Sequence, residues 1–125
     1  MSTMNPLSLI VCIKQVPDPE APFSGYRIDA EAKRVVPVGV PPVISPFDEN
    51  ALELALRLRE MYGGKITALS AGKNLSAAVL RKALFVGADE LILVDAPEQE
   101  AHRYNSCFTA ALLCEAVKKI GGFDL

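Results

Sequence analysis

The sequence of 125 residues contains no tryptophan, a single histidine and three cysteines. His102 follows no pattern that would pair it with a serine or cysteine nucleophile, and one histidine with three scattered cysteines is a poor zinc-ligand set. Cys12, Cys107 and Cys114 form no Cys-x-x-Cys pair, so we expect free, reduced thiols. These scarcities argue against nucleophilic triads, metal sites and disulfide scaffolds.

The sequence also lacks a basic surplus and a long apolar run. Thirteen Lys and Arg residues stand against fifteen Asp and Glu residues, which gives a net charge of −2. A nucleic-acid surface needs clustered positive charge to displace phosphate counterions, so we expect no nucleic-acid partner. No apolar stretch approaches the roughly 20 residues that span a bilayer, and the first residues do not resemble a secretory signal. We therefore expect no membrane insertion and a cytoplasmic location.

Proline is concentrated in one part of the chain. Eight of the nine prolines lie within the first 46 residues, which predicts a loop-rich excursion there and regular structure afterwards. Residues 7–13 form a nearly continuous apolar run, typical of a strand buried on both faces. Further strands are expected at 65–70 and 90–95 and, as a short hairpin, at 26–29 and 34–37.

Three helices are expected after this excursion, with caps at Ser45, Asn74 and Asn105. The first helix has Pro46 at its first position, and Asp48, three residues after Ser45, resembles the second half of a capping box. We expect Arg59 on its solvated face. Its apolar residues follow a helical period and are expected to form one buried stripe: Phe47, Ala51, Leu54, Ala55, Leu58 and Met61.

Strands that alternate with helices indicate βαβ units and a parallel sheet covered on both faces. We therefore predict a single α/β domain over residues 1–125, with a three-layer αβα arrangement around a parallel sheet. Residues 123–125 resemble the start of a fourth strand. We accordingly expect this domain to be truncated there, as the amino-terminal part of a longer chain.

Ligands of open α/β sheets bind outside the carboxyl ends of the strands. Residues 12–14, 70–72 and 95–96 end the three expected strands, and the start of the first helix is able to join them. Each segment also has a simple structural explanation. Ser45 and Asp48 are able to serve as caps of the first helix, and Asp95 as a turn residue. No Gly-x-x-x-x-Gly-Lys-Ser/Thr loop and no Gly-x-Gly-x-x-Gly fingerprint are present, so the residues indicate a nucleotide only in general terms.

Four stretches together resemble the amino-terminal part of the β subunit of electron transfer flavoproteins, the family that includes the FixA proteins. They are residues 11–18 (VCIKQVPD), 45–53 (SPFDENALE), 67–72 (TALSAG) and 80–89 (LRKALFVGAD). Their order and spacing extend through nearly the whole chain. The Pro-Phe-Asp-Glu-Asn-Ala and Gly-Ala-Asp segments carry the resemblance most strongly.

The resemblance implies a Rossmann-like domain of the adenine-nucleotide-binding type, and a heterodimeric electron carrier that is not an enzyme. In that family the α subunit holds the redox-active FAD, while the β subunit binds AMP or, in electron-bifurcating members, a second FAD. Electrons pass from flavin dehydrogenases, such as acyl-CoA dehydrogenases, to a quinone reductase or another acceptor. The family's cofactor contacts fall on Cys12, Ser45, Pro46, Phe47, Asp48 and Ala71. Its main phosphate-binding loop falls beyond Leu125, so we expect residues 1–125 alone to bind nucleotide weakly or not at all.

Two other interpretations stay open. A stand-alone adenine-nucleotide-binding domain of the universal-stress-protein kind would share the α/β architecture, although the Gly-rich phosphate loop usual in that class is not present. A small α/β enzyme would need an acid or base at the carboxyl end of a strand, where Asp95 is the candidate.

Overall fold

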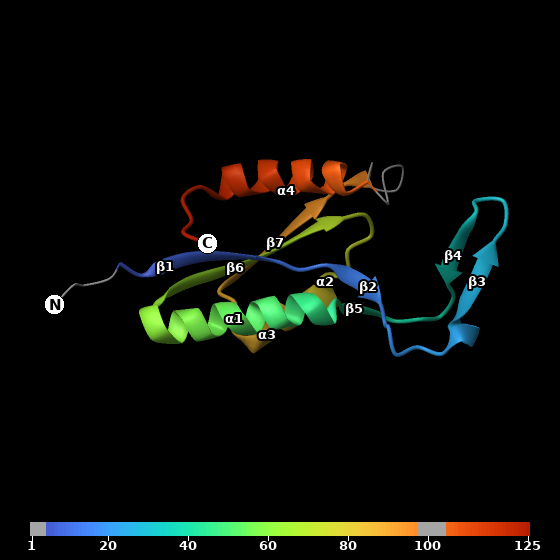
Figure 1. Cartoon of the computed structure of the whole chain (residues 1–125), viewed down its shortest axis with the longest axis horizontal. Helices are drawn as coiled ribbons and strands as arrows, with labels where there is room; N and C mark the ends of the chain where they lie inside the picture. Colours follow the sequence, from blue (N-terminus) through green and yellow to red (C-terminus); the bar gives the residue numbers. More distant parts are fainter. Residues whose placement is uncertain (1–4, 98–104) are drawn as a thin grey trace.

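The computed structural model describes residues 5–97 and 105–125, so His102 lies outside the described residues. A parallel three-stranded sheet in the order β1–β6–β7 lies at its centre (Figure 1). These strands are β1 (Leu7–Cys12), β6 (Gly64–Gly72) and β7 (Glu90–Asp95). All three were predicted, and β6 is longer than expected because it begins at the glycine pair and continues to Gly72.

Helices cover both faces of this sheet. They are α1 (Pro46–Tyr62), α2 (Ala77–Leu80), α3 (Lys82–Val86) and α4 (Ser106–Ile120). The helices α1, α2 and α3 lie on one side and α4 on the other (Figure 1). This arrangement confirms the predicted α/β class, the parallel sheet and the three layers.

The main core lies between the sheet and the layer of α1, α2 and α3. Its buried members are Leu9, Val11, Ile13, Ile44, Leu52, Ala55, Ile66, Ala68, Leu80, Ala83 and Ala88. Ile66 and Leu80 are fully enclosed, and a side chain of this size stabilises the fold by about 1.5–3 kcal/mol when buried. The continuous apolar character of β1 and β6 is explained by helices on both faces.

The single buried stripe predicted for α1 is wrong. Phe47, Leu54 and Met61 are 84%, 56% and 69% exposed, and the buried residues of α1 are Leu52 and Ala55. The apolar residues of α1 divide between two directions, because only one side of the helix meets the sheet. An apolar groove of about 290 Å³ lies between α1 and β1, lined by Leu9, Ile10, Val11, Cys12, Ala51, Leu54, Ala55, Leu58 and Leu125.

The proline-rich excursion contains two small antiparallel sheets and a short 3₁₀ helix, η1 (Phe23–Gly25). The strands are β2 (Gln15–Pro17), β3 (Tyr26–Asp29), β4 (Arg34–Pro37) and β5 (Pro42–Ile44). The pair β3–β4 is the predicted hairpin and projects away from the central sheet (Figure 1). The pair β2–β5 returns the chain to the end of β1, directly before α1 begins.

One of the three predicted helix starts differs from the structure. Asn105 caps α4 as expected, since its side-chain oxygen accepts a hydrogen bond from the Phe108 N–H at 3.1 Å. Asn74 does not cap the second helix. It adopts a left-handed conformation with φ of 56°, which asparagine tolerates, and the cap moves to Ser76, whose hydroxyl accepts from Val79 N–H at 3.4 Å.

The last residues of the chain lie along β1. Asp124 N–H donates to Ser8 O at 2.8 Å, and Ile10 N–H donates to Leu125 O at 2.8 Å. These bonds use the edge of β1 that does not face β6. The residues therefore occupy the place expected of a neighbouring strand, although they do not form a regular strand.

Candidate functional site

The order of the strands locates the candidate site at the end of β1. Successive strands β6 and β7 extend the sheet on one side of β1, and after α4 the chain returns to the opposite edge of β1 at residues 124–125. The direction in which the sheet grows therefore reverses at β1. In open α/β sheets, ligands bind outside the carboxyl ends of the strands at such a reversal. Cys12, the last residue of β1, marks this position.

The backbone of Lys14 joins the end of β1 to the start of α1. Its N–H donates to Asp48 Oδ2 at 2.7 Å, and its carbonyl oxygen accepts from Ser45 N–H at 2.8 Å. The predicted capping box is wrong. The Asp48 carboxylate accepts from the Lys14 N–H, and within the described residues the Ser45 hydroxyl makes no cap hydrogen bond. These contacts bring Ser45 and Asp48 to the end of the strand that carries Cys12.

The start of α1 has features that suit an anionic or planar ligand. Pro46 stands at the first helical position, as predicted, and the positive end of the dipole of this 17-residue helix lies at this edge. The Phe47 ring is largely exposed, so one aromatic face is accessible to a flat ligand. The N–H groups of Asp48 and Glu49 are both directed at Ser45 O, at 2.9 and 3.0 Å. These two N–H groups are therefore already engaged within the helix, which leaves fewer donors at this turn for a ligand.

The end of β6 forms the second wall of the candidate site. Ala71 is half-buried and pairs with Val94 of β7, and Gly72 O accepts from Ala96 N–H at 2.9 Å. Ala71 therefore lies at the same carboxyl edge of the sheet as Cys12. Asp95, the candidate acid or base, is exposed at the end of β7. Within residues 5–97 and 105–125, no group of three or more His, Cys, Asp and Glu side chains is placed to hold a metal ion.

Cys12 is an exposed residue whose surroundings disfavour the thiolate form. Partial burial raises the pKa of the Cys12 thiol, and the nearby Asp48 carboxylate raises it further. A raised pKa lowers the thiolate fraction at neutral pH, which makes a nucleophilic role unfavourable. Cys12 therefore presents backbone atoms and an uncharged sulfur to a ligand at this edge.

One polar contact at this edge was not predicted from the sequence. The Gln15 side chain accepts from Ser76 N–H at 2.6 Å and donates to Asn74 O at 3.2 Å. It thus connects the end of β1 with the loop between β6 and α2. The only sequence signal was the position of Gln15 directly after Lys14, within the stretch that carries the family resemblance.

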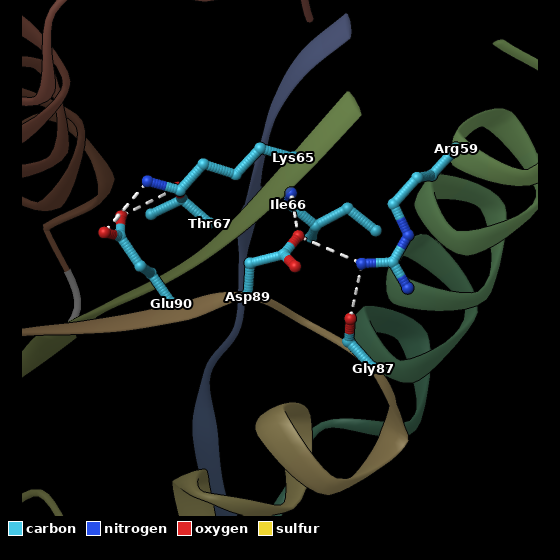
Figure 2. Close-up of polar contacts among 7 residues, drawn as sticks. All are labelled: Arg59, Lys65, Ile66, Thr67, Gly87, Asp89 and Glu90. Atoms are coloured by element: carbon cyan, nitrogen blue, oxygen red, sulfur yellow. Dashed lines mark hydrogen bonds and ion pairs between the residues drawn. The ribbon is translucent and has the colours of Figure 1, made fainter. Parts of the chain in front are cut away.

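A second polar cluster lies at the opposite end of the sheet (Figure 2). Asp89 Oδ2 accepts from Ile66 N–H at 2.8 Å and from Arg59 Nη1 at 3.0 Å, and Arg59 Nη1 also donates to Gly87 O at 2.7 Å. The Ile66 N–H and, after it, Arg59 hold the pKa of Asp89 below its usual value. The Arg59 side chain is 27% exposed, so its expected place on a solvated face is wrong.

This cluster gives the Gly-Ala-Asp segment a structural role. Asp89 precedes β7 and binds the start of β6, so its carboxylate sets the relation of two neighbouring strands to α1. A further ion pair, Lys65 with Glu90 at 2.9 Å, lies beside it (Figure 2). All of these contacts lie at the amino ends of β6 and β7, away from Cys12. The strongest parts of the sequence resemblance therefore serve two different ends of the sheet.

No helix within the described part of the chain is both long enough and apolar enough to cross a membrane.

Known proteins match this chain over most of its length. The family model described as "Electron transfer flavoprotein domain" matches residues 34–125. The chain is 42% identical over 114 residues to "Electron transfer flavoprotein subunit beta" of Thermoanaerobacterium thermosaccharolyticum, covering 90% of this chain and 41% of that protein. It is 36% identical over 115 residues to "Protein FixA" of Sinorhizobium fredii, covering 92% and 38%. It is also 36% identical over 115 residues to "Electron transfer flavoprotein subunit beta" of Megasphaera elsdenii, covering 91% and 40%. The chain thus spans about two fifths of the length of these relatives.

Proposed function

Because this chain belongs to the electron transfer flavoprotein domain family, we propose that it acts within the β subunit of a heterodimeric electron carrier. Its part is to hold an adenine nucleotide, either AMP or a second FAD, at the carboxyl edge of the sheet. The redox-active FAD belongs to a partner α subunit. This role needs no catalytic acid, base or nucleophile in the chain, which is compatible with a neutral Cys12 and an exposed Asp95.

The observation that carries this proposal is the convergence of three segments at the end of β1. Residues 45–48, held by the Lys14 backbone, stand next to Cys12, and Ala71 lies one residue before the end of the neighbouring strand β6. The start of a 17-residue helix favours phosphate and ribose oxygens, and the Phe47 ring offers an apolar surface. We propose Cys12, Ser45, Pro46, Phe47, Asp48 and Ala71 as the nucleotide-contacting residues.

The assembly and its location follow from the same proposal. Two of the relatives are named subunit beta, which supports an α subunit as the partner. Flavin dehydrogenases would donate electrons to that complex in the cytoplasm. Co-expression with an α subunit of this family is expected to give a co-purifying complex with flavin absorbance. A flavin-free α subunit that separates from this chain on gel filtration would contradict the assembly.

Nuclear magnetic resonance titration with AMP, and separately with FAD, tests the nucleotide site. We expect saturable amide shifts at Cys12, Phe47, Asp48 and Ala71, with a Kd of about 1 mM or weaker, because residues 1–125 contain no Gly-rich phosphate loop. Amides of Ile66 and Asp89, at the other end of the sheet, serve as internal controls. Inorganic phosphate at the same concentrations separates recognition of the nucleoside from simple anion binding. Shifts centred on the control amides, or the same shifts with inorganic phosphate alone, would contradict the proposal.

A further inference from the structure

Gln15 occupies a position between the two walls of the candidate site. Its backbone pairs with Ile44 in the β2–β5 sheet, and Ile44 directly precedes the start of α1. Its side chain reaches in the other direction, to the loop between β6 and α2. One residue therefore has its backbone on the wall that carries residues 45–48 and its side chain on the wall that carries Ala71.

The loop that Gln15 holds has little regular structure of its own. Asn74 is in the left-handed conformation, and α2 does not begin until Ala77. Ser76 lies at the cap position, where a backbone N–H has no partner within the helix. The Gln15 Oε1 accepts this N–H at 2.6 Å, and the Gln15 Nε2 satisfies Asn74 O at 3.2 Å. An amide side chain suits the loop because it offers one acceptor and donors together.

We infer that Gln15 is a positioning residue for nucleotide binding, which fixes the spacing between the start of α1 and the end of β6. This inference rests on the proposed function. Lys14 and Gln15 are consecutive, and between them they bind Ser45, Asp48, Asn74 and Ser76. A ligand that bridges both walls binds more tightly when their spacing is set in advance, because less ordering is required on binding. Gln15 itself need not touch the nucleotide.

Substitution of Gln15 by methionine tests this role. Gln15→Met keeps the length of the side chain and removes both hydrogen bonds. We expect AMP or FAD to bind about five- to tenfold more weakly, the consequence of losing one or two net hydrogen bonds that order the site. We also expect faster amide hydrogen exchange at Ser76 without a change at Ile66 in the core. Glu20→Met is the matched control, because Glu20 is an exposed residue shortly after β2 and lies outside the candidate site; it should leave both measurements unchanged.

The variant Gln15→Glu separates the two hydrogen bonds. A carboxylate still accepts from Ser76 N–H but no longer donates to Asn74 O. We expect near-native exchange at Ser76 and a nucleotide affinity between those of the wild-type and methionine proteins. A purely structural role would instead speed exchange at Ile66 and Ser76 together in Gln15→Met.

The outcomes distinguish this inference from the proposed function. If the wild-type chain shows no nucleotide response, residues 1–125 do not form the proposed nucleotide site by themselves and the positioning role falls with it. If the wild type responds and Gln15→Met binds with the same Kd, the positioning role alone is wrong. If Gln15→Met weakens binding while Ser76 keeps its slow exchange, the weakening does not come from the loop and the inference is also overturned.

Discussion

The two ends of the parallel sheet carry aspartates that make the same kind of contact within different surroundings. Asp89 accepts from the backbone N–H of Ile66, and Asp48 accepts from the backbone N–H of Lys14, at 2.8 and 2.7 Å. At the amino end, Arg59 donates to both Asp89 and Gly87 O, so these contacts are all made within the fold (Figure 2). At the carboxyl end, Asp48 stands at a helix start beside an exposed aromatic ring.

This difference separates residues that hold the fold from residues that are placed to meet a ligand. Both aspartates lie in segments that resemble the same family, so the resemblance by itself does not distinguish their roles. The surroundings do, because Asp89 binds a strand N–H and the Arg59 guanidinium within the fold, whereas Asp48 stands at a helix start beside an exposed aromatic ring. Variants at the two ends should therefore affect stability and nucleotide binding in different proportions.

The largest effect is expected at Gly64, at the amino end. Gly64 has a φ of +126°, and a Cβ there would lie 2.0 Å from Leu7 O and 2.5 Å from Leu7 N. Because both obstacles are backbone atoms of β1, Gly64→Ala should lower the free energy of unfolding by on the order of 3 kcal/mol or more. Urea denaturation followed by circular dichroism measures it. Gly122→Ala is the control, because no atom of the described residues lies within 4 Å of a Cβ at that position. A wild-type midpoint for Gly64→Ala would show that this end of the sheet is not rigid.

Removal of the Asp89 carboxylate should be the next most severe change. Asp89→Ala leaves the buried Ile66 N–H and the Arg59 guanidinium without this acceptor. We expect a loss of about 1–3 kcal/mol, toward the lower value because the Asp89 side chain is 43% exposed. Nucleotide-induced shifts at the carboxyl edge should persist. Glu53→Ala, which removes an exposed ion pair with Arg57, should change stability by less than about 0.5 kcal/mol. A stable Asp89→Ala protein that has lost its nucleotide response would assign Asp89 to the site.

Substitution of Asp48 should affect nucleotide binding more, and stability less, than substitution of Asp89. Asp48→Ala loses the hydrogen bond to Lys14 N–H, with an expected cost of about 0.5–1.5 kcal/mol in unfolding free energy. Nucleotide binding should weaken about threefold or more, because the start of α1 is no longer held beside Cys12. Asp48→Asn keeps an acceptor for Lys14 and removes a negative charge, so binding should not weaken. Equal strengthening in both variants would mean that charge at the helix start, and not its placement, controls the affinity.

Much of the fold is predictable from local sequence. The apolar runs predict β1, β6 and β7, and Asn105 caps α4 because its oxygen reaches a partner only three residues away. The failures share a different cause. The Asp48 carboxylate accepts from Lys14 and not from an N–H group of its own helix turn. Arg59 donates to Asp89, thirty residues further along the chain. Such contacts depend on which strands become neighbours, and no local pattern contains that information.

The candidate site was predictable in place but not in its internal connections. The rule for parallel sheets brings Cys12 and Ala71 to one edge, and the structure also places the start of α1 there. Nucleotide contact by these residues stays a prediction. The part played by Gln15 was not visible, because both of its partners lie about sixty residues away in a loop whose cap the sequence misplaced at Asn74.

The smallest effect concerns the reactivity of Cys12. Because burial and the Asp48 carboxylate raise its pKa, the rate of alkylation by iodoacetamide should rise with pH to a midpoint above the usual value of about 8.5. All three cysteines are exposed, so the raised pKa should make Cys12 react a few times more slowly than Cys107 and Cys114 at pH values below that midpoint, as measured by mass spectrometry of one digest. Asp48→Asn should lower the midpoint only slightly, because burial is the larger cause. If Cys12 were instead the fastest of the three thiols, the carboxyl edge would hold a reactive nucleophile. A catalytic role would then have to be considered for that edge, in place of ligand binding alone.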